Sequence, residues 1–199
     1  MANISHSTLT DPYLHEPKGV GAATAGYTYR ANGAGSGAWE RVQGFSQYED
    51  SRITVGTPTM TIATGVRTQL LNNGGTLTLE HPPSDATASL WNTTTNKHVP
   101  IAAFDMYDIR LGFKAESYTG TSPYILCELD IGGGIGVIFD QIIPLVKGGA
   151  QQPCAFAFPV FTGSTYLANG GTFYLTYVGT APCVIYDTNI LISRTSREL

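Results

Sequence analysis

The sequence predicts an all-β fold, an antiparallel β-sandwich or jelly roll that follows an extended N-terminal arm. Charged residues make up only 13% of the 199 residues, while glycine (23), proline (11) and tyrosine (11) are frequent. This composition is typical of short strands joined by tight turns. The third observation is an alternation of apolar and polar residues in the second half of the chain. Two domains of about 100–150 residues and a linker would not fit this length, so we expect one domain with an appendage.

The alternation identifies individual strands. In residues 107–114 the odd positions are apolar and the even ones polar or glycine, as in a strand with one solvated face. Residues 125–131 repeat the pattern and place Glu128 and Asp130 on one polar side. Residues 154–160 and 173–177 also place large apolar residues at every second position. Turn signals such as Gly132-Gly133-Gly134 separate the strands, and the only helical turn considered is at 86–91. Further strands are expected at 53–57, 60–63, 67–71, 76–79, 136–144 and 184–193.

Residues 1–44 are predicted to form the arm, ahead of a domain at 45–199. Large apolar side chains are sparse there, and 33–37 reads Gly-Ala-Gly-Ser-Gly, so the segment buries too little surface to order itself. Residues 27–30 and 39–42 flank this glycine-rich stretch and predict a small hairpin; the alternative is a flexible linker. The spaced larger residues are predicted to anchor the arm on a neighbouring surface: Tyr13, Leu14, His15, Pro17, Tyr27, Tyr29, Trp39 and Val42.

Charge and cysteine content argue against several partners. The formal net charge is −4 and the Lys and Arg residues are scattered, whereas nucleic-acid binding depends largely on clustered cations. No apolar run approaches the about 20 residues of a membrane span, and the first residues lack the features of a signal peptide. Cys127, Cys154 and Cys183 lie in apolar runs, which predicts buried free thiols. We therefore expect no nucleic acid, membrane, metal or cofactor, and synthesis in the cytoplasm.

No catalytic signature is present, so the chain is not predicted to be an enzyme. The glycine-rich stretch 132–136 is not followed by the Gly-Lys-Ser/Thr of a phosphate loop, and a Gly-x-Ser-x-Gly elbow is absent. Carboxylates such as Asp105, Glu128 and Asp130 could in principle form an acid–base pair, but solvated surface is the expectation. The histidines have no ligand-type partner two or four residues away: His6, His15, His81 and His98.

Several segments resemble small jelly-roll proteins of tailed bacteriophages. Leu90-Trp91-Asn92-Thr93-Thr94-Thr95-Asn96, followed by Asp105-Met106-Tyr107-Asp108-Ile109-Arg110-Leu111, is similar to paired segments of that group. Residues 190–194 fit the end of its last strand loosely, and residues 15–39 look like the opening of phage virion proteins. The resemblance implies a homotrimer with a tumour-necrosis-factor-like jelly roll in each subunit and an arm that attaches it. Trimerisation would also cover Tyr124, Ile138 and Tyr174, which the alternation places on outer faces.

Composition and resemblance together predict a structural virion protein that decorates and stabilises the capsid, as a cement or head-fibre protein. Its expected partner is the major capsid protein, and its expected location is the capsid surface of a virion assembled in the bacterial host cytoplasm. The alternative is a tail-fibre or receptor-binding knob that binds host-surface glycan, with loops at Trp91, Asn96, His98 and Tyr118 facing the ligand. A polysaccharide-degrading enzyme and a self-assembling shell protein are less favoured, because the long strand repeat of the first and a basic arm are missing.

Overall fold

A computed structural model describes residues 23–31, 37–50, 60–72, 75–117, 122–146 and 148–197. Backbone packing divides the chain into two units, Met1–Val42 and Gln43–Leu199. The described part of the first unit is a two-stranded antiparallel hairpin, formed by β1 (Thr28–Ala31) and β2 (Gly37–Glu40). The expected strand at 53–57 lies outside the described residues.

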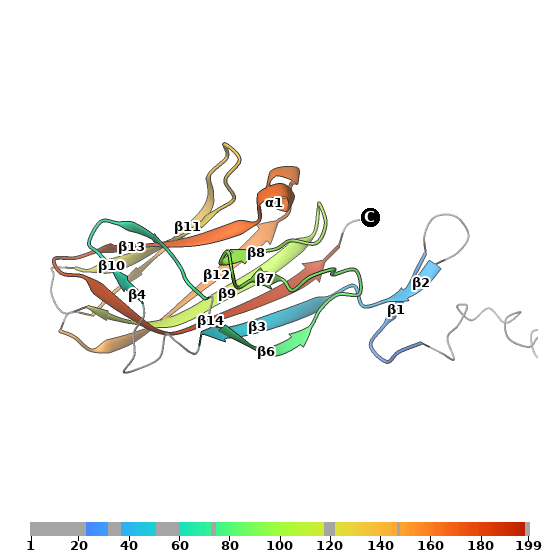
Figure 1. Cartoon of the computed structure of the whole chain (residues 1–199), viewed down its shortest axis with the longest axis horizontal. Helices are drawn as coiled ribbons and strands as arrows, with labels where there is room; N and C mark the ends of the chain where they lie inside the picture. The colour runs from blue at the N-terminus through green and yellow to red at the C-terminus, as the bar shows by residue number, and fades with distance from the viewer. Residues whose placement is uncertain are drawn as a thin grey trace, which may run out of the picture. The chain divides into compact units, whose positions relative to one another are not determined.

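The second unit contains two antiparallel six-stranded sheets (Figure 1). One has the order β12-β9-β14-β3-β6 with β4 beside β14, and its strands are β3 (Gly44–Asp50), β4 (Met60–Ile62), β6 (Gly75–His81), β9 (Met106–Ser117), β12 (Gln151–Phe161) and β14 (Cys183–Ser196). The other has the order β11-β10-β13-β8-β7 with β5 beside β13, and its strands are β5 (Arg67–Gln69), β7 (Trp91–Asn92), β8 (Lys97–His98), β10 (Tyr124–Asp130), β11 (Val137–Pro144) and β13 (Gly171–Val178). The chain crosses between the sheets after β4, β5, β6, β8, β9, β11, β12 and β13. The fold is therefore a jelly-roll β-sandwich.

Strand pairing brings the alternating apolar positions into layers. In the sheet that contains β9, Leu111 lies opposite Phe156 of β12 on one side and Ile190 of β14 on the other. Paired residues point to the same face of a sheet, so the inward side chains of these three strands form one continuous apolar surface. The strands predicted from alternation at 107–114, 125–131, 154–160 and 173–177 are confirmed.

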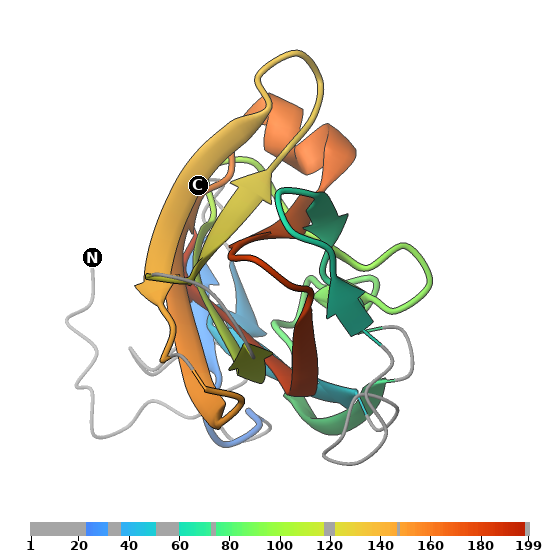
Figure 2. The same ribbon diagram turned by 90° about the vertical axis from the view of Figure 1, so that its left-hand side faces the viewer.

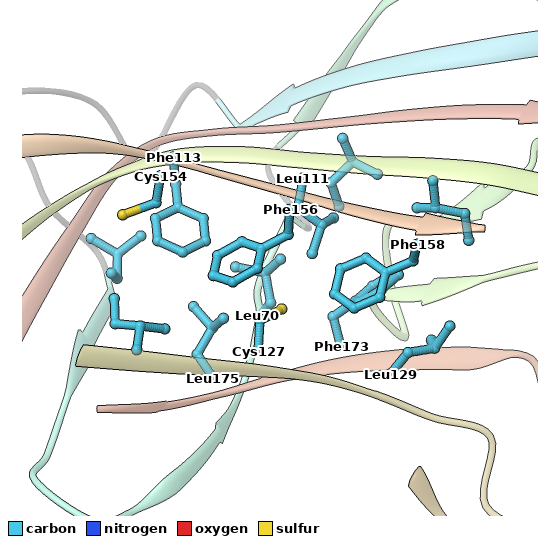
Figure 3. Packing of buried hydrophobic residues seen from close by; sticks show 14 of the residues in the cluster. Leu70, Leu111, Phe113, Cys127, Leu129, Cys154, Phe156, Phe158, Phe173 and Leu175 are labelled. Atoms are coloured by element: carbon cyan, nitrogen blue, oxygen red, sulfur yellow. The ribbon is translucent and has the colours of Figure 1, made fainter. Parts of the chain in front are cut away.

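The core lies between the sheets and is rich in aromatic residues (Figure 3). Phe156 and Phe158 project from β12 toward Phe173 of β13, and the ring centroids of Phe158 and Phe173 are 5.1 Å apart. Cys127 and Cys154 lie in the same layer, and with Cys183 they are buried and free, as predicted. Burial raises the pKa of Cys154 to about 11 and that of Cys183 to about 12, because a thiolate would lose its hydration there.

A short helix, α1 (Ser164–Asn169), interrupts the β pattern between β12 and β13. It was not predicted, whereas 86–91, the helical turn that was considered, contains bends and irregular backbone and ends in the first residue of β7. The turn between β10 and β11 packs beside α1 at one end of the sandwich (Figure 2). A Cβ on Gly133 would lie 2.7 Å from Thr165 Cγ2 and from Asn169 Nδ2, and the φ of Gly133 is +59°. Glycine is therefore required there, and the predicted glycine turn at 132–134 is confirmed.

Side chains join the two edge strands β11 and β12, which belong to different sheets. Gln141 Nε2 of β11 donates to the Ala157 carbonyl of β12 at 2.9 Å, and the Ala157 N–H donates back to Gln141 Oε1 at 3.3 Å. Near the other end of these strands, Gln152 Nε2 donates to the Pro144 carbonyl at 3.0 Å and Gln152 Oε1 accepts from the Val146 N–H at 2.7 Å. This flank of the sandwich is thus closed by two glutamine amides.

Candidate functional site

The hairpin of the first unit carries an aromatic pair and balances its own charges. Tyr29 and Trp39 lie directly opposite each other in the β1–β2 register, and their rings meet edge to face with centroids 5.4 Å apart. Arg30 Nη1 lies 3.5 Å from Glu40 Oε2. Both rings are only partly buried, so the hairpin combines an edge-to-face aromatic pair with paired charges.

The structure places only half of the predicted arm anchors. Tyr27, Tyr29, Trp39 and Val42 lie in the described part of the first unit, where the Arg41 guanidinium is 5.4 Å from the Tyr27 ring centroid. The other anchors lie outside the described residues, as does the loop residue Tyr118: Tyr13, Leu14, His15 and Pro17. Attachment through these side chains stays a prediction.

The expectation that Trp91, Asn96 and His98 face a ligand is wrong, because all three are buried. Trp91 and His98 pair across β7 and β8 and point into the sandwich. The Trp91 ring stacks on Phe173 with centroids 6.3 Å apart. Asn96 adopts a φ of +54° and its Oδ1 accepts from the Asn72 N–H at 2.5 Å. These residues therefore join the second sheet to the core.

His98 is enclosed on every side. Its Nδ1 shares a hydrogen bond of 2.6 Å with the Tyr166 hydroxyl of α1, and its ring meets Tyr107 edge to face with centroids 4.6 Å apart. Burial lowers the pKa of His98 from 6.5 to about 3, because the imidazolium would have no solvent around it. His98 is therefore neutral at physiological pH, and it ties α1 to the sandwich.

A buried ion cluster centred on Arg194 links the last strand to two distant loops. Arg194 forks onto Asp85 at 2.7 and 3.0 Å, and its Nη1 reaches Asp105 Oδ2 at 3.1 Å. Burial alone would raise the pKa of Asp85, but the hydrogen bonds and charge of Arg194 hold it below its usual value. Asp105 is fully buried, so the expectation that it is solvated surface is wrong. The fork ties the C-terminal strand to both loops, which is a structural role.

The outer face of the sheet that contains β5, β10 and β13 carries a second charged cluster. Glu128 and Asp130 share the polar side of β10 as predicted, and Arg67 of β5 donates to both, at 2.9 and 2.8 Å. The Arg67 guanidinium lies 3.7 Å from the centroid of the Tyr174 ring. The two carboxylates thus share one guanidinium, which also covers one face of the tyrosine ring.

A groove of about 400 Å³ opens at the end of the sandwich, between the β10–β11 turn, the end of β12 and α1. We call it the end groove. Its walls are mainly apolar and carry no charged side chain; among them are Ile135 and Ile138 on one side and Phe161 on the other. Such a groove can accommodate apolar groups. It was not predicted, because its walls come from three segments that only folding brings together.

Phe104 stands beside the end groove in a conformation that large residues avoid. Its φ is +67°, which costs about 1–2 kcal/mol for a residue other than glycine. The conformation is held because the Phe104 N–H donates to the Thr162 carbonyl at 2.6 Å and the Thr162 N–H donates to the Asp105 carbonyl at 2.9 Å. The Phe104 ring lies 5.7 Å from that of Phe161, and both rings are half exposed, at 54% and 50%.

Nowhere in the described ranges do three or more His, Cys, Asp or Glu side chains gather so that they could hold a metal ion. Within the same ranges, no helix has the length and apolar character of a membrane span.

The chain is thus an antiparallel jelly-roll sandwich with a separate hairpin unit. No protein-family model matches it, and no curated protein matches its sequence. Solved structures of similar fold include the PRD1 vertex protein P5, with 13% identity over 77% of this chain and 97% of that one and a TM-score of 0.45. Eiger TNF from S. frugiperda has 7% identity over 80% and 100%, with a TM-score of 0.47. The cowpea mosaic virus top component, a naturally occurring empty particle, has 14% identity over 77% and 85%, with a TM-score of 0.29. The fold assignment rests on the strand order itself.

Proposed function

We propose that this chain is a structural protein of a tailed-bacteriophage particle that decorates and stabilises the capsid, attached through its N-terminal arm. The observation that carries the proposal is the separate hairpin, with its partly exposed Tyr29–Trp39 pair and its internally paired charges. A two-stranded hairpin is at most marginally stable alone, and it gains stability when its aromatic face docks on another chain. The resemblance of residues 15–39 and 90–111 to phage virion proteins supports the same setting.

The proposal includes a homotrimer, in which three arms act together. Each arm offers only a few anchoring side chains, so a single arm would bind weakly. Linking three of them makes the second and third contacts intramolecular, which raises the overall affinity without new contacts. The major capsid protein is the proposed partner of the arms.

The described residues of the sandwich do not favour the alternative of a glycan-binding knob. Three of its four candidate residues are buried, namely Trp91, Asn96 and His98. Tyr174 lies opposite Glu128 of β10, and the Arg67 guanidinium covers one face of its ring.

The test measures binding of the full chain to capsids assembled without it. We expect the double change of Tyr29→Ala and Trp39→Ala to reduce the bound fraction in co-sedimentation about tenfold or more, because aromatic anchors dominate such contacts. The matched control is Val66→Ala, an exposed apolar residue of the second unit. Electron cryo-microscopy of decorated particles should show the protein at regular sites over the head. Normal binding by the double variant, or density at the tail alone, would refute the proposal.

A further inference from the structure

Exposed apolar side chains gather around the end groove in one continuous patch. Its members are between 37% and 58% exposed: Phe104, Met106, Ile135, Ile138 and Phe161. Phe161 connects them, because it lies opposite Met106 in the β9–β12 register, meets the Phe104 ring, and lines the groove with both isoleucines. We call this set the apolar patch. Soluble chains rarely leave so many neighbouring apolar groups in water without a partner.

The conformation of Phe104 strengthens this interpretation. Its backbone is held in the left-handed region by the two hydrogen bonds with Thr162 and Asp105, and the result is a ring that stands half in solvent. These hydrogen bonds account for the backbone conformation, but they leave the ring half exposed. Strained residues cluster where a protein contacts a ligand or partner, and a partner that covers the ring would account for its exposure.

The charge distribution restricts what the partner can be. Residues 131–182 contain only two charged side chains, Asp140 and Lys147, and the walls of the end groove contain none. A nucleic acid or an anionic lipid surface would require cations here. The whole chain has a formal net charge of −4, so two copies carry net charge of the same sign. A contact through an uncharged face brings no like charges together.

We infer that a second copy of this chain covers the apolar patch, so that the end groove and the Phe104–Phe161 pair form a contact between subunits. Five side chains, each about half exposed, expose roughly 400–500 Å² of apolar surface. A standard interface covers about 800 Å² on each partner, with an apolar centre and a polar rim. The patch supplies that centre. The inference rests on the proposed homotrimer and identifies the surface that its subunits use.

The test is the oligomeric state of the full chain, measured by sedimentation velocity over a range of concentrations. We expect the wild type to associate and Phe161→Asp to associate at least about tenfold more weakly, because the carboxylate would be buried without a partner in the contact. The control is Val66→Asp, which changes a residue of similar exposure, 51%, outside the patch. It should associate as the wild type does.

A second variant guards against misfolding of the first. Phe104→Gly relieves the left-handed strain and removes the ring, so it should keep or raise the melting temperature while weakening association. If both variants fold and associate like the wild type, the patch is not the contact surface, although the proposed trimer could still stand. A wild type that stays monomeric at every concentration overturns the inference and the trimer together. Capsid binding, measured on the same samples, tests the arm independently.

Discussion

Acidification should destabilise the sandwich through one residue, His98. The unfolded chain takes up a proton on this imidazole near the ordinary pKa of 6.5, whereas burial holds the folded pKa at about 3. Below pH 6.5 the proton therefore favours the unfolded state. The contribution of neutral His98 to the free energy of unfolding is fully present above pH 6.5 and is lost as the pH falls toward 3. At 1.36 kcal/mol per pH unit, the loss is about 2 kcal/mol by about pH 5 and about 5 kcal/mol by about pH 3.

The assay compares urea unfolding of the wild type and His98→Asn at pH 7 and about pH 5, at equal protein concentration. Asparagine can still pair with the Tyr166 hydroxyl but does not titrate, so the wild type should lose about 2 kcal/mol more than the variant. Tyr166→Phe serves as a control, because it removes the hydrogen bond and keeps the titrating ring. Its pH dependence should match the wild type. Equal losses by the wild type and His98→Asn would mean that His98 takes up its proton in the folded state without penalty, contrary to the structure.

Three further outcomes are expected from the buried groups. Arg194→Met should cost about 3–5 kcal/mol in urea unfolding, because it leaves the carboxylate of Asp105 buried without its cation; a loss below about 1 kcal/mol would contradict the ion cluster. Phe158→Ala should cost about 3–5 kcal/mol by the same measurement, because it opens a cavity between the sheets. The thiols of Cys154 and Cys183, with pKa values raised to about 11 and 12, should react with a disulfide reagent only after unfolding, and rapid reaction of the native chain would count against their burial.

The sandwich strands were predictable because their environment has two sides. Each residue of β9 from Tyr107 to Lys114 faces either the core or the outer surface. Burial therefore imposes a period of two, which is visible in the order of apolar and polar residues along the sequence. The hairpin around Tyr29 and Trp39 was predictable because a glycine-rich stretch separates two aromatic segments. In both cases the deciding interactions are local or periodic.

The features that were missed depend on long-range contacts. Helix α1 has only six residues and no side-chain cap, so neither helical periodicity nor a capping signal marks it. The partners of Arg194 are 109 and 89 residues away along the chain, and no spacing rule connects them. The tight turn between β7 and β8, in which Asn92 Oδ1 accepts from the Thr94 and Thr95 N–H groups, was not predicted. The expectation of exposed loops at Trp91, Asn96 and His98 was wrong, because two-residue strands are too short to show alternation.

The glutamine closure between β11 and β12 has a consequence for crowded assembly. The Ala157 N–H faces away from β9, and residues two apart direct their amides to the same side of a strand. Pro159, two residues after Ala157, and Pro153, four residues before it, therefore have no N–H to present on this side. Along this edge only Ala155 between the prolines keeps an outward N–H that the glutamine does not take up. A chain displayed at high local density risks joining neighbours into endless sheets through such edges. Along the β12 edge, the two prolines and the Gln141 amide hinder that route to aggregation.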